Sequence, residues 1–262
     1  MFRFMFIFLL ASFHVFGQEK PYDLYLLIGQ SNMAGRGTIE AQDTAFYPRV
    51  LTLNKENKWV AAKDPIHFDK PIAGVGLGRT FGIEMAKAYP DAIIGLIPCA
   101  VGGSPIDAWK PGAFYEETGS HPFDDMEKRL KIALKSGQLK GILWHQGESD
   151  SNPKLCYEYK EKLEKLIQRF RVLGENKDAP FVACELGRFK INDNKKEYSG
   201  LKPAPAEVVM NATKEVIKSD KNGAFVKANG LRDRGDRTHF NSNSYRILGK
   251  RYAKAMQKLQ KD

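Results

Sequence analysis

The sequence predicts a three-layer α/β/α domain built on a doubly wound parallel sheet. Short, unbroken apolar runs recur along the chain, and amphipathic helical patterns lie between them. Apolar runs without alternation are typical of strands buried on both faces, as in a parallel sheet. Strands that alternate with helices favour a sheet with helices on both faces. A length of 262 residues suits one domain of this kind.

The expected elements follow from these patterns in order along the chain. Apolar runs predict strands over residues 24–28, 92–97, 141–144 and 181–184. Apolar residues at helical spacing predict helices over residues 79–89, 124–136, 155–173, 206–219 and 244–259. Residues 38–78 are rich in polar residues, proline and glycine, so we expect loops over the sheet edge there. Because no internal repeat or linker interrupts the pattern, we expect one domain over residues 18–262.

The first residues predict a secretory signal peptide over residues 1–17. Arg3 gives a positive start, residues 4–16 are almost wholly apolar, and Val15 and Gly17 are small residues before Gln18. We expect cleavage near Gly17/Gln18 and a secreted or periplasmic chain; the alternative is an uncleaved N-terminal anchor. Later segments are not apolar over the ~18 residues that a spanning helix needs, so we expect no integral membrane span in the mature chain.

Charge and cysteine content argue against several classes of protein. The net charge of +10 is spread over single lysines without a stripe of arginines and aromatics, so we expect a solvated basic surface and no nucleic-acid partner. The three cysteines, Cys99, Cys156 and Cys184, allow at most one disulfide, and buried thiols are an equal alternative. Without a CxxC pair or zinc-like His/Cys spacing, we expect no metal and no other cofactor.

Ligands of such sheets bind at the carboxyl ends of the strands, so the residues after each strand are the candidate site. Ser31 follows the first strand in the segment Gly29-Gln30-Ser31-Asn32. A hydroxyl close to unpaired backbone N–H groups suits the nucleophile of an acyl transfer. Serine is also a favoured N-cap of a helix. On this segment alone both interpretations stand.

The second and third strands are followed by candidate oxyanion donors. Gly102 is a candidate backbone donor with Gly103 as the alternative, although an isolated glycine pair is typical of a tight turn. Gln146 can donate an amide N–H without changing its charge state. We expect its neighbour His145 to be a packing residue rather than a base, and Glu148 to be a structural anchor of the loop.

The loop before the last helix contains Asp236 and His239. An aspartate three residues before a histidine can reach the imidazole Nδ1 and leave Nε2 free to take a proton from a serine. Asp233 lies six residues before His239 and is the weaker candidate. Nucleophile, oxyanion donors, base and orienting acid are therefore expected at one sheet edge, and together they are the set that acyl transfer requires.

Four segments carry a family resemblance: GQSNMAG from Gly29, AVGGS from Ala100, WHQGES from Trp144 and DRTHF from Asp236. With these segments the chain resembles the SGNH hydrolase superfamily, and within it the branch of sialic-acid-type acetylesterases and acetylxylan esterases (carbohydrate esterase family 6). The resemblance implies a flavodoxin-like fold and a metal-free site that removes acetyl groups from carbohydrate.

The resemblance also assigns roles to individual residues. It implies that Ser31 attacks the acetyl carbonyl, that His239 accepts the serine proton and that Asp236 orients His239. It implies oxyanion donation by the backbone N–H groups of Ser31 and Gly102 and by the Gln146 side chain. Many members of the superfamily have asparagine where this chain has Gln146.

The expected partner is an acetylated poly- or oligosaccharide, with acetylated xylan or a related hemicellulose first and O-acetyl sialic acid as the alternative. Trp109 and Tyr115 follow the glycine pair and are candidates for an apolar sugar platform, or else for core or rim aromatics. Glu148 is expected to brace its loop through Arg36. The competing functions are a lipase or thioesterase for longer acyl chains and a carbohydrate-binding protein without catalysis.

Overall fold

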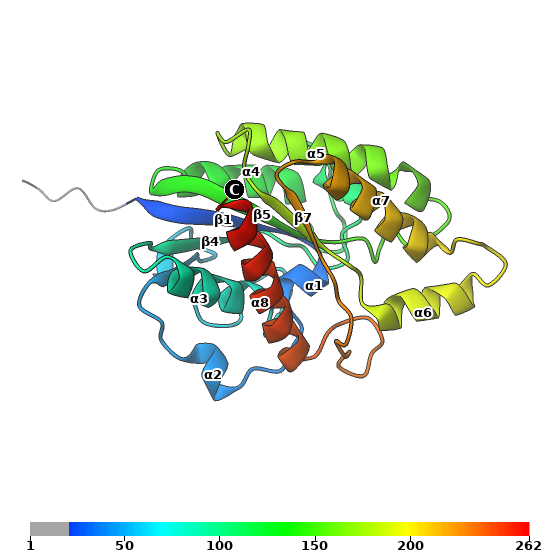
Figure 1. The fold of residues 1–262 in the computed structure, drawn as a ribbon, viewed down its shortest axis with the longest axis horizontal. Helices are drawn as coiled ribbons and strands as arrows, with labels where there is room; N and C mark the ends of the chain where they lie inside the picture. Colours follow the sequence, from blue (N-terminus) through cyan, green and yellow to red (C-terminus); the bar gives the residue numbers. More distant parts are fainter. Residues whose placement is uncertain (1–20, 262) are drawn as a thin grey trace, which may run out of the picture.

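The structure, a computed structural model, describes residues 21–261, so the expected signal peptide lies outside the described residues. A seven-stranded sheet with the order β3-β2-β4-β1-β5-β6-β7 runs through it (Figure 1). Every neighbouring pair is parallel except β2 and β3. The strands are β1 (Tyr22–Gly29), β2 (Val50–Leu53), β3 (Trp59–Ala61), β4 (Ile94–Pro98), β5 (Gly137–His145), β6 (Phe181–Cys184) and β7 (Gly223–Val226).

Helices cover both faces of this sheet. The α-helices are α1 (Ser31–Ala34), α2 (Ala41–Thr44), α3 (Gly78–Ala88), α4 (Pro122–Ala133), α5 (Tyr159–Leu173), α6 (Arg188–Glu197), α7 (Pro205–Ser219) and α8 (Ser242–Leu259). Helices α4, α5 and α7 lie on one face, and α3 and α8 lie on the other (Figure 1). The predicted three-layer, doubly wound α/β/α fold is confirmed.

Strand β1 shows why the sheet is buried on both sides. Its residues alternate between the two hydrophobic cores, with Leu24 and Leu26 in the core under α4 and α5, and Tyr25 and Leu27 in the core under α3 and α8. All four are wholly buried. Such a strand has no polar face, which explains the continuous apolar run in the sequence.

The prediction of loops over residues 38–78 was wrong, because α2, β2 and β3 lie there. Strands β2 and β3 have four and three residues and extend the sheet at its edge. Val60 in the middle of β3 is 40% exposed, so this three-residue edge strand is not buried on both faces, and its apolar run is shorter than those that predict the central strands. Strand β7 was also missed, at the other edge of the sheet. Within residues 21–261, no helix combines the length and the apolar character that crossing a bilayer requires.

The sheet order places the end of β1 at a topological switch point. Strand β1 lies between β4 and β5. After β1, the chain first forms β2, β3 and β4 on one side of it and then crosses to form β5, β6 and β7 on the other. Gly29 ends β1 opposite His145 with a φ of 134°, and a Cβ there would lie 2.1 Å from the His145 carbonyl oxygen. Only glycine permits this close approach. Ser31 therefore follows β1 at the position where sheets of this kind bind their ligands.

Candidate active site

Ser31 is the first residue of helix α1, directly after the turn at Gly29 and Gln30. The N-cap residue of this helix is Gln30, which makes no side-chain capping bond, so Ser31 does not cap the helix. The Ser31 side chain is nearly buried, and its hydroxyl lies 2.9 Å from the Nε2 atom of His239. The capping interpretation therefore does not describe this serine.

Ser31, His239 and Asp236 form a continuous chain of hydrogen bonds. The Nδ1 atom of His239 lies 2.8 Å from Asp236 Oδ2, on the side of the ring away from Ser31. Asp236 Oδ1 also accepts the backbone N–H groups of Thr238 at 2.9 Å and of His239 at 2.8 Å. With a proton on Nδ1, the Nε2 atom is free to accept the proton of the Ser31 hydroxyl.

The Asp236 carboxylate stays ionised because its neighbours favour the charged form. Partial burial acts to raise its pKa, but the hydrogen bonds from the His239 backbone and ring, and from the Thr238 backbone, outweigh burial and lower the pKa below its usual range. The side chain is nevertheless 40% exposed, and that of His239 is 23% exposed. This part of the site therefore opens to solvent.

Asn32 joins the turn that contains Ser31 to the loop that contains His239. Its Nδ2 atom donates to Glu148 Oε1 at 2.5 Å and to the Thr238 carbonyl oxygen at 3.0 Å. Its Oδ1 atom accepts the Tyr245 hydroxyl at 2.8 Å and the Phe240 N–H at 3.3 Å. A role for Asn32 was not predicted from the sequence. Its position beside Ser31 in the GQSNMAG segment was the one feature that could have indicated it.

The contact of Glu148 differs from the one predicted. Glu148 braces the loop after β5 against Asn32, whereas Arg36 pairs with Asp69 at 2.6 Å. Both side chains of the Arg36–Asp69 pair are almost fully buried. The prediction that Glu148 acts through Arg36 was therefore wrong, because Asp69 occupies that guanidinium.

The predicted role of Gln146 conflicts with the contacts of its amide. Its Nε2 atom lies within hydrogen-bond distance of three acceptors, Gln30 Oε1 at 3.1 Å, the Ser104 carbonyl at 3.1 Å and Asp150 Oδ2 at 2.5 Å. Its Oε1 atom accepts the Tyr159 hydroxyl at 2.8 Å. The amide has two hydrogens, so this buried network leaves Gln146 no donor for an oxyanion.

In contrast to Gln146, Gln30 keeps its amide N–H group free among the described residues. Its Oε1 atom accepts from Gln146 Nε2 and from the backbone N–H groups of Gly147 and Ser149, both at 3.3 Å. Its Nε2 atom has no hydrogen-bond partner among residues 21–261. The side chain is 3% exposed and immediately precedes Ser31, so it is an amide donor held next to the nucleophile.

In the glycine pair after β4, the N–H group of Gly102 is hydrogen-bonded, whereas that of Gly103 has no partner among residues 21–261. The Gly102 N–H donates to Asp69 Oδ2 at 2.8 Å, and a Cβ on Gly102 would collide with Arg36 and Asp69. In the part of the chain that the structure describes, the N–H groups of Gly103 and Ser31 have no partner. The donor first expected at Gly102 is therefore occupied, and Gly103, the alternative, is open.

The predicted aromatic platform is not formed by Trp109. This residue is wholly buried, packs edge-to-face on Trp144 with ring centroids 5.8 Å apart, and donates its indole N–H to Ser104 Oγ. It is a core residue and cannot contact a sugar. Tyr115 is half-buried beside Gly103 and keeps its place as a candidate at the rim.

Two further titratable side chains near the site, His145 and Asp150, are buried. His145 is wholly buried against Tyr252 and Phe240, and burial lowers its pKa, so it is a neutral packing residue. Burial raises the pKa of Asp150 to about 6.

All three cysteines are free and buried, so the disulfide alternative is excluded. Among the described residues, no group of three His, Cys, Asp or Glu side chains is placed to hold a metal ion.

Comparison with curated proteins finds relatives of one kind. A probable carbohydrate esterase of Arabidopsis thaliana is 35% identical over 150 residues, which cover 50% of this chain and 55% of that protein. The sialate O-acetylesterase of Homo sapiens is 30% identical over 169 residues, covering 50% of this chain and 32% of that protein. The matches thus span about half or less of these relatives.

Comparison with solved structures finds the same fold. The crystal structure of the Arabidopsis thaliana protein has a TM-score of 0.76 and 27% identity, and the match covers 91% of this chain and 99% of that one. A carbohydrate acetylesterase from Xanthomonas citri has a TM-score of 0.67 and 21% identity over 90% of this chain and 56% of that one. The second likeness shows the fold alone.

A family model described as carbohydrate esterase, sialic acid-specific acetylesterase matches residues 21–258. This match covers nearly all of the residues that form the sheet, its helices and the Ser31–His239–Asp236 chain. The chain therefore belongs to the family of sialic acid-specific acetylesterases among the carbohydrate esterases.

Proposed function

We propose that this protein is a serine esterase that removes O-acetyl groups from carbohydrate, without a metal or another cofactor. The observation that carries the proposal is the chain of two short hydrogen bonds from Ser31 through His239 to Asp236. It unites a nucleophile, a base and an orienting carboxylate in the order that acyl transfer needs. Membership of a carbohydrate esterase family supports the acetyl group and the sugar.

The proposed reaction has two steps. Ser31 Oγ attacks the acetyl carbonyl while its proton passes to His239 Nε2, and the tetrahedral intermediate expels the sugar oxygen, which takes that proton and leaves as an alcohol. Water then loses a proton to Nε2 and attacks the acetyl-serine. The Ser31 oxygen takes the proton held on Nε2, and acetic acid leaves and loses its remaining proton to solvent as acetate. Asp236 holds the ring and stabilises its charged form throughout.

We propose that the oxyanion is held by the Ser31 N–H, the Gly103 N–H and Gln30 Nε2. These three donors lack partners among residues 21–261, whereas the hydrogens of Gly102 and Gln146 are engaged. Donors that are fixed before the reaction stabilise developing charge without reorganisation. Gln146 then has a positioning role, because its amide holds Gln30 Oε1.

For the finer substrate, we propose acetylated hemicellulose such as xylan, with O-acetyl sialic acid as the second candidate. The second candidate is supported by the sialate O-acetylesterase of Homo sapiens, which matches half of this chain. We also propose that the chain is exported, from Arg3, the apolar stretch after it and the small residues before Gln18.

The experiment that tests the proposal compares Ser31→Ala with Ser199→Ala, whose serine is exposed on a distant loop. Ser31→Ala should lower kcat for an aryl acetate by about 10⁴-fold or more and abolish labelling by a fluorophosphonate. Ser199→Ala should behave as wild type. Full turnover by a folded Ser31→Ala protein would end the serine-esterase proposal. Acetate release from acetylated xylan and from O-acetyl sialic acid would then choose the sugar.

A further inference from the structure

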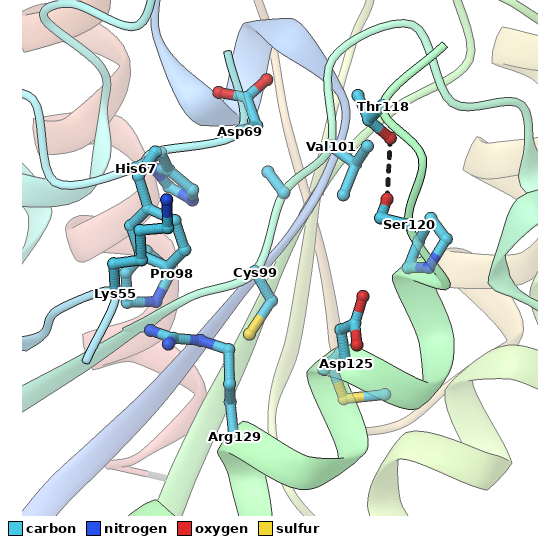
Figure 2. Close-up of a pocket in the computed structure, with 14 residues that line it drawn as sticks. Lys55, His67, Asp69, Pro98, Cys99, Val101, Thr118, Ser120, Asp125 and Arg129 are labelled. Carbon is cyan, nitrogen blue, oxygen red and sulfur yellow. Dashed lines mark hydrogen bonds between the residues drawn. The ribbon is translucent and has the colours of Figure 1, made fainter. Parts of the chain in front are cut away.

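A cavity of about 300 Å³, lined by both polar and apolar side chains, lies beside the loop that follows β4 (Figure 2). Figure 2 shows His67, Asp69, Asp125 and Arg129 arranged around one space, with the Cys99 thiol toward its middle. The hydrogen-bonded hydroxyls of Thr118 and Ser120, 2.7 Å apart, form another part of its wall. The catalytic residues do not line this cavity, and the reaction proposed above gives it no role.

His67 is the feature that points to a ligand. The residue is 2% exposed, and neither ring nitrogen has a hydrogen-bond partner of normal geometry among residues 21–261. Burial lowers its pKa to about 4, so the ring is neutral near pH 7 and offers one donor and one acceptor. A buried polar ring without partners is unfavourable unless something in the cavity pairs with it.

The charges around the cavity favour a neutral ligand rich in hydroxyl groups. Arg129 gives most of its N–H groups to the Leu53 and Asn54 carbonyls and to Asn57, but its Nε atom is buried without a partner. The Asp125 carboxylate lines the cavity, whereas the Asp69 carboxylate points away from it, pairs with Arg36 and accepts the Gly102 N–H. An anion would meet the Asp125 carboxylate, whereas a hydroxyl can donate to Asp125 and accept from Lys55 at once.

The rim of the cavity suits a sugar ring. Phe68 is 40% exposed, and the Arg129 guanidinium lies 4.7 Å from its ring centre, which fixes the aromatic face beside the opening. Lys55, which is exposed, adds another hydrogen-bond donor at the edge. An exposed aromatic face with convergent polar groups is the usual composition of a site for a small polar ligand.

Asp69 connects this cavity to the catalytic loop. Asp69 lines the cavity, and its carboxylate, on the side away from the cavity, accepts the Gly102 N–H at 2.8 Å. Ala100 and Val101 form part of the cavity wall. Gly102 is next to Gly103, one of the proposed oxyanion donors. A ligand in the cavity would therefore contact Ala100 and Val101, which lie in the same loop as the proposed oxyanion donor Gly103.

We propose that this cavity binds a neutral pyranose unit of the substrate, adjacent in the sugar chain to the unit whose acetyl group is removed. The inference rests on the proposed function, since it assigns the cavity to the same substrate. It implies that an acetylated oligosaccharide gains binding free energy that an acetylated monosaccharide or an aryl acetate does not.

The first test fills the cavity from its loop side. In Ser120→Trp the indole would occupy the space, whereas Glu116→Trp places the same side chain on the exposed part of the same loop. For Ser120→Trp we expect kcat/KM for acetylated xylotriose to fall by about tenfold relative to that for an aryl acetate. Glu116→Trp should keep the wild-type ratio. An unchanged ratio in an active Ser120→Trp protein would overturn the inference.

The second test needs no turnover and uses Cys99 as a reporter. Its thiol lines the cavity and is 8% exposed, and burial raises its pKa to about 11, so N-ethylmaleimide should modify it slowly. Unacetylated xylotriose at twice its Kd should slow this modification about threefold, measured by mass spectrometry of the Cys99 peptide. No protection by xylotriose or cellotriose would refute the sugar site even if Ser31 proves catalytic. Protection would support it even if Ser31→Ala retained activity.

Discussion

Two aspartates flank the nucleophile turn from opposite environments. Asp236 lies on the loop before α8, is 40% exposed and has a lowered pKa because N–H groups of His239 and Thr238 point at it. Asp150 lies after β5, is wholly buried and has a pKa raised to about 6. In the proposed reaction the exposed side of the site transfers protons, whereas the buried side holds hydrogen-bond donors and acceptors in fixed positions. A base must exchange protons with water, and a polar network that stabilises charge works best where water is excluded.

The largest expected effect lies on the open side. Asp236→Asn should reduce kcat/KM for an aryl acetate by about 10⁴-fold, because an amide no longer favours the ring tautomer with a proton on Nδ1. Asp233→Asn is the matched control, since Asp233 accepts only backbone N–H groups of Gly235 and Arg237 in its own loop, as far as residues 21–261 show. A comparable loss in both variants would mean that the loop conformation, rather than the contact with His239, is what matters.

The pH dependence of the wild-type enzyme sharpens the same point. Because the pKa of Asp236 is lowered, its charge is present above the ordinary value near 3.9 and is lost only as the pH falls through the lowered value. Activity that is lost as the pH falls from 7 toward 5 should therefore not come from Asp236, and a single protonation elsewhere lowers log kcat/KM by at most about one per pH unit. A steeper fall around pH 6 would show that protonation of Asp150 also contributes.

The second effect tests which glutamine donates to the oxyanion. Gln30→Glu keeps the oxygen that accepts from Gly147 and Ser149 but loses the free N–H, so kcat should fall by about 10²- to 10³-fold with little change in KM. Gln146→Met should lower the free energy of unfolding by about 1–3 kcal/mol, because the buried partners of Gln146 lose their bonds, with a smaller loss of kcat. A larger loss of kcat in Gln146→Met than in Gln30→Glu would mean that Gln146, not Gln30, donates to the oxyanion.

The smallest effect concerns stability on the buried side. A carboxyl whose pKa is raised to about 6 on folding binds its proton more tightly in the folded state, so its contribution to stability decreases as the pH rises from about 4 to about 6. Asp150→Asn removes this dependence. Relative to wild type, the variant should gain up to about 3 kcal/mol of unfolding free energy between pH 4 and pH 7. Urea denaturation at both values measures the difference, and any packing penalty that is independent of pH cancels.

The same contrast explains what could be predicted from the sequence. Central strands such as β1 and β5 were predicted because burial on both faces leaves a long apolar run. Strands β2, β3 and β7 have only three or four residues, lie toward or at the sheet edges and are less completely buried, so their short runs were missed. The spacing of Asp236 and His239 is local in the chain, so their contact could be predicted.

The polar network beneath the site could not be predicted from the sequence. Gln30 and Gln146 are both amides at strand ends, and only the coordinates show which hydrogens are already taken. The pairing of Glu148 with Asn32 instead of Arg36 depends on Asp69, which lies in a segment expected to be loops. For Trp109 the sequence left a sugar platform, a core residue and a rim residue as alternatives, and only its packing against Trp144 decides between them.

Asn32 has a consequence for when the enzyme becomes active. Its side chain ties the nucleophile turn to the backbone of Thr238 and Phe240 and to Tyr245 of α8, across more than 200 residues of chain. During synthesis, Ser31 leaves the ribosome long before His239, which is 208 residues away. Until the residues around His239 are made and folded, Ser31 therefore stands without its proposed base. The contact between Ser31 and His239 can form only after α8 docks against Asn32.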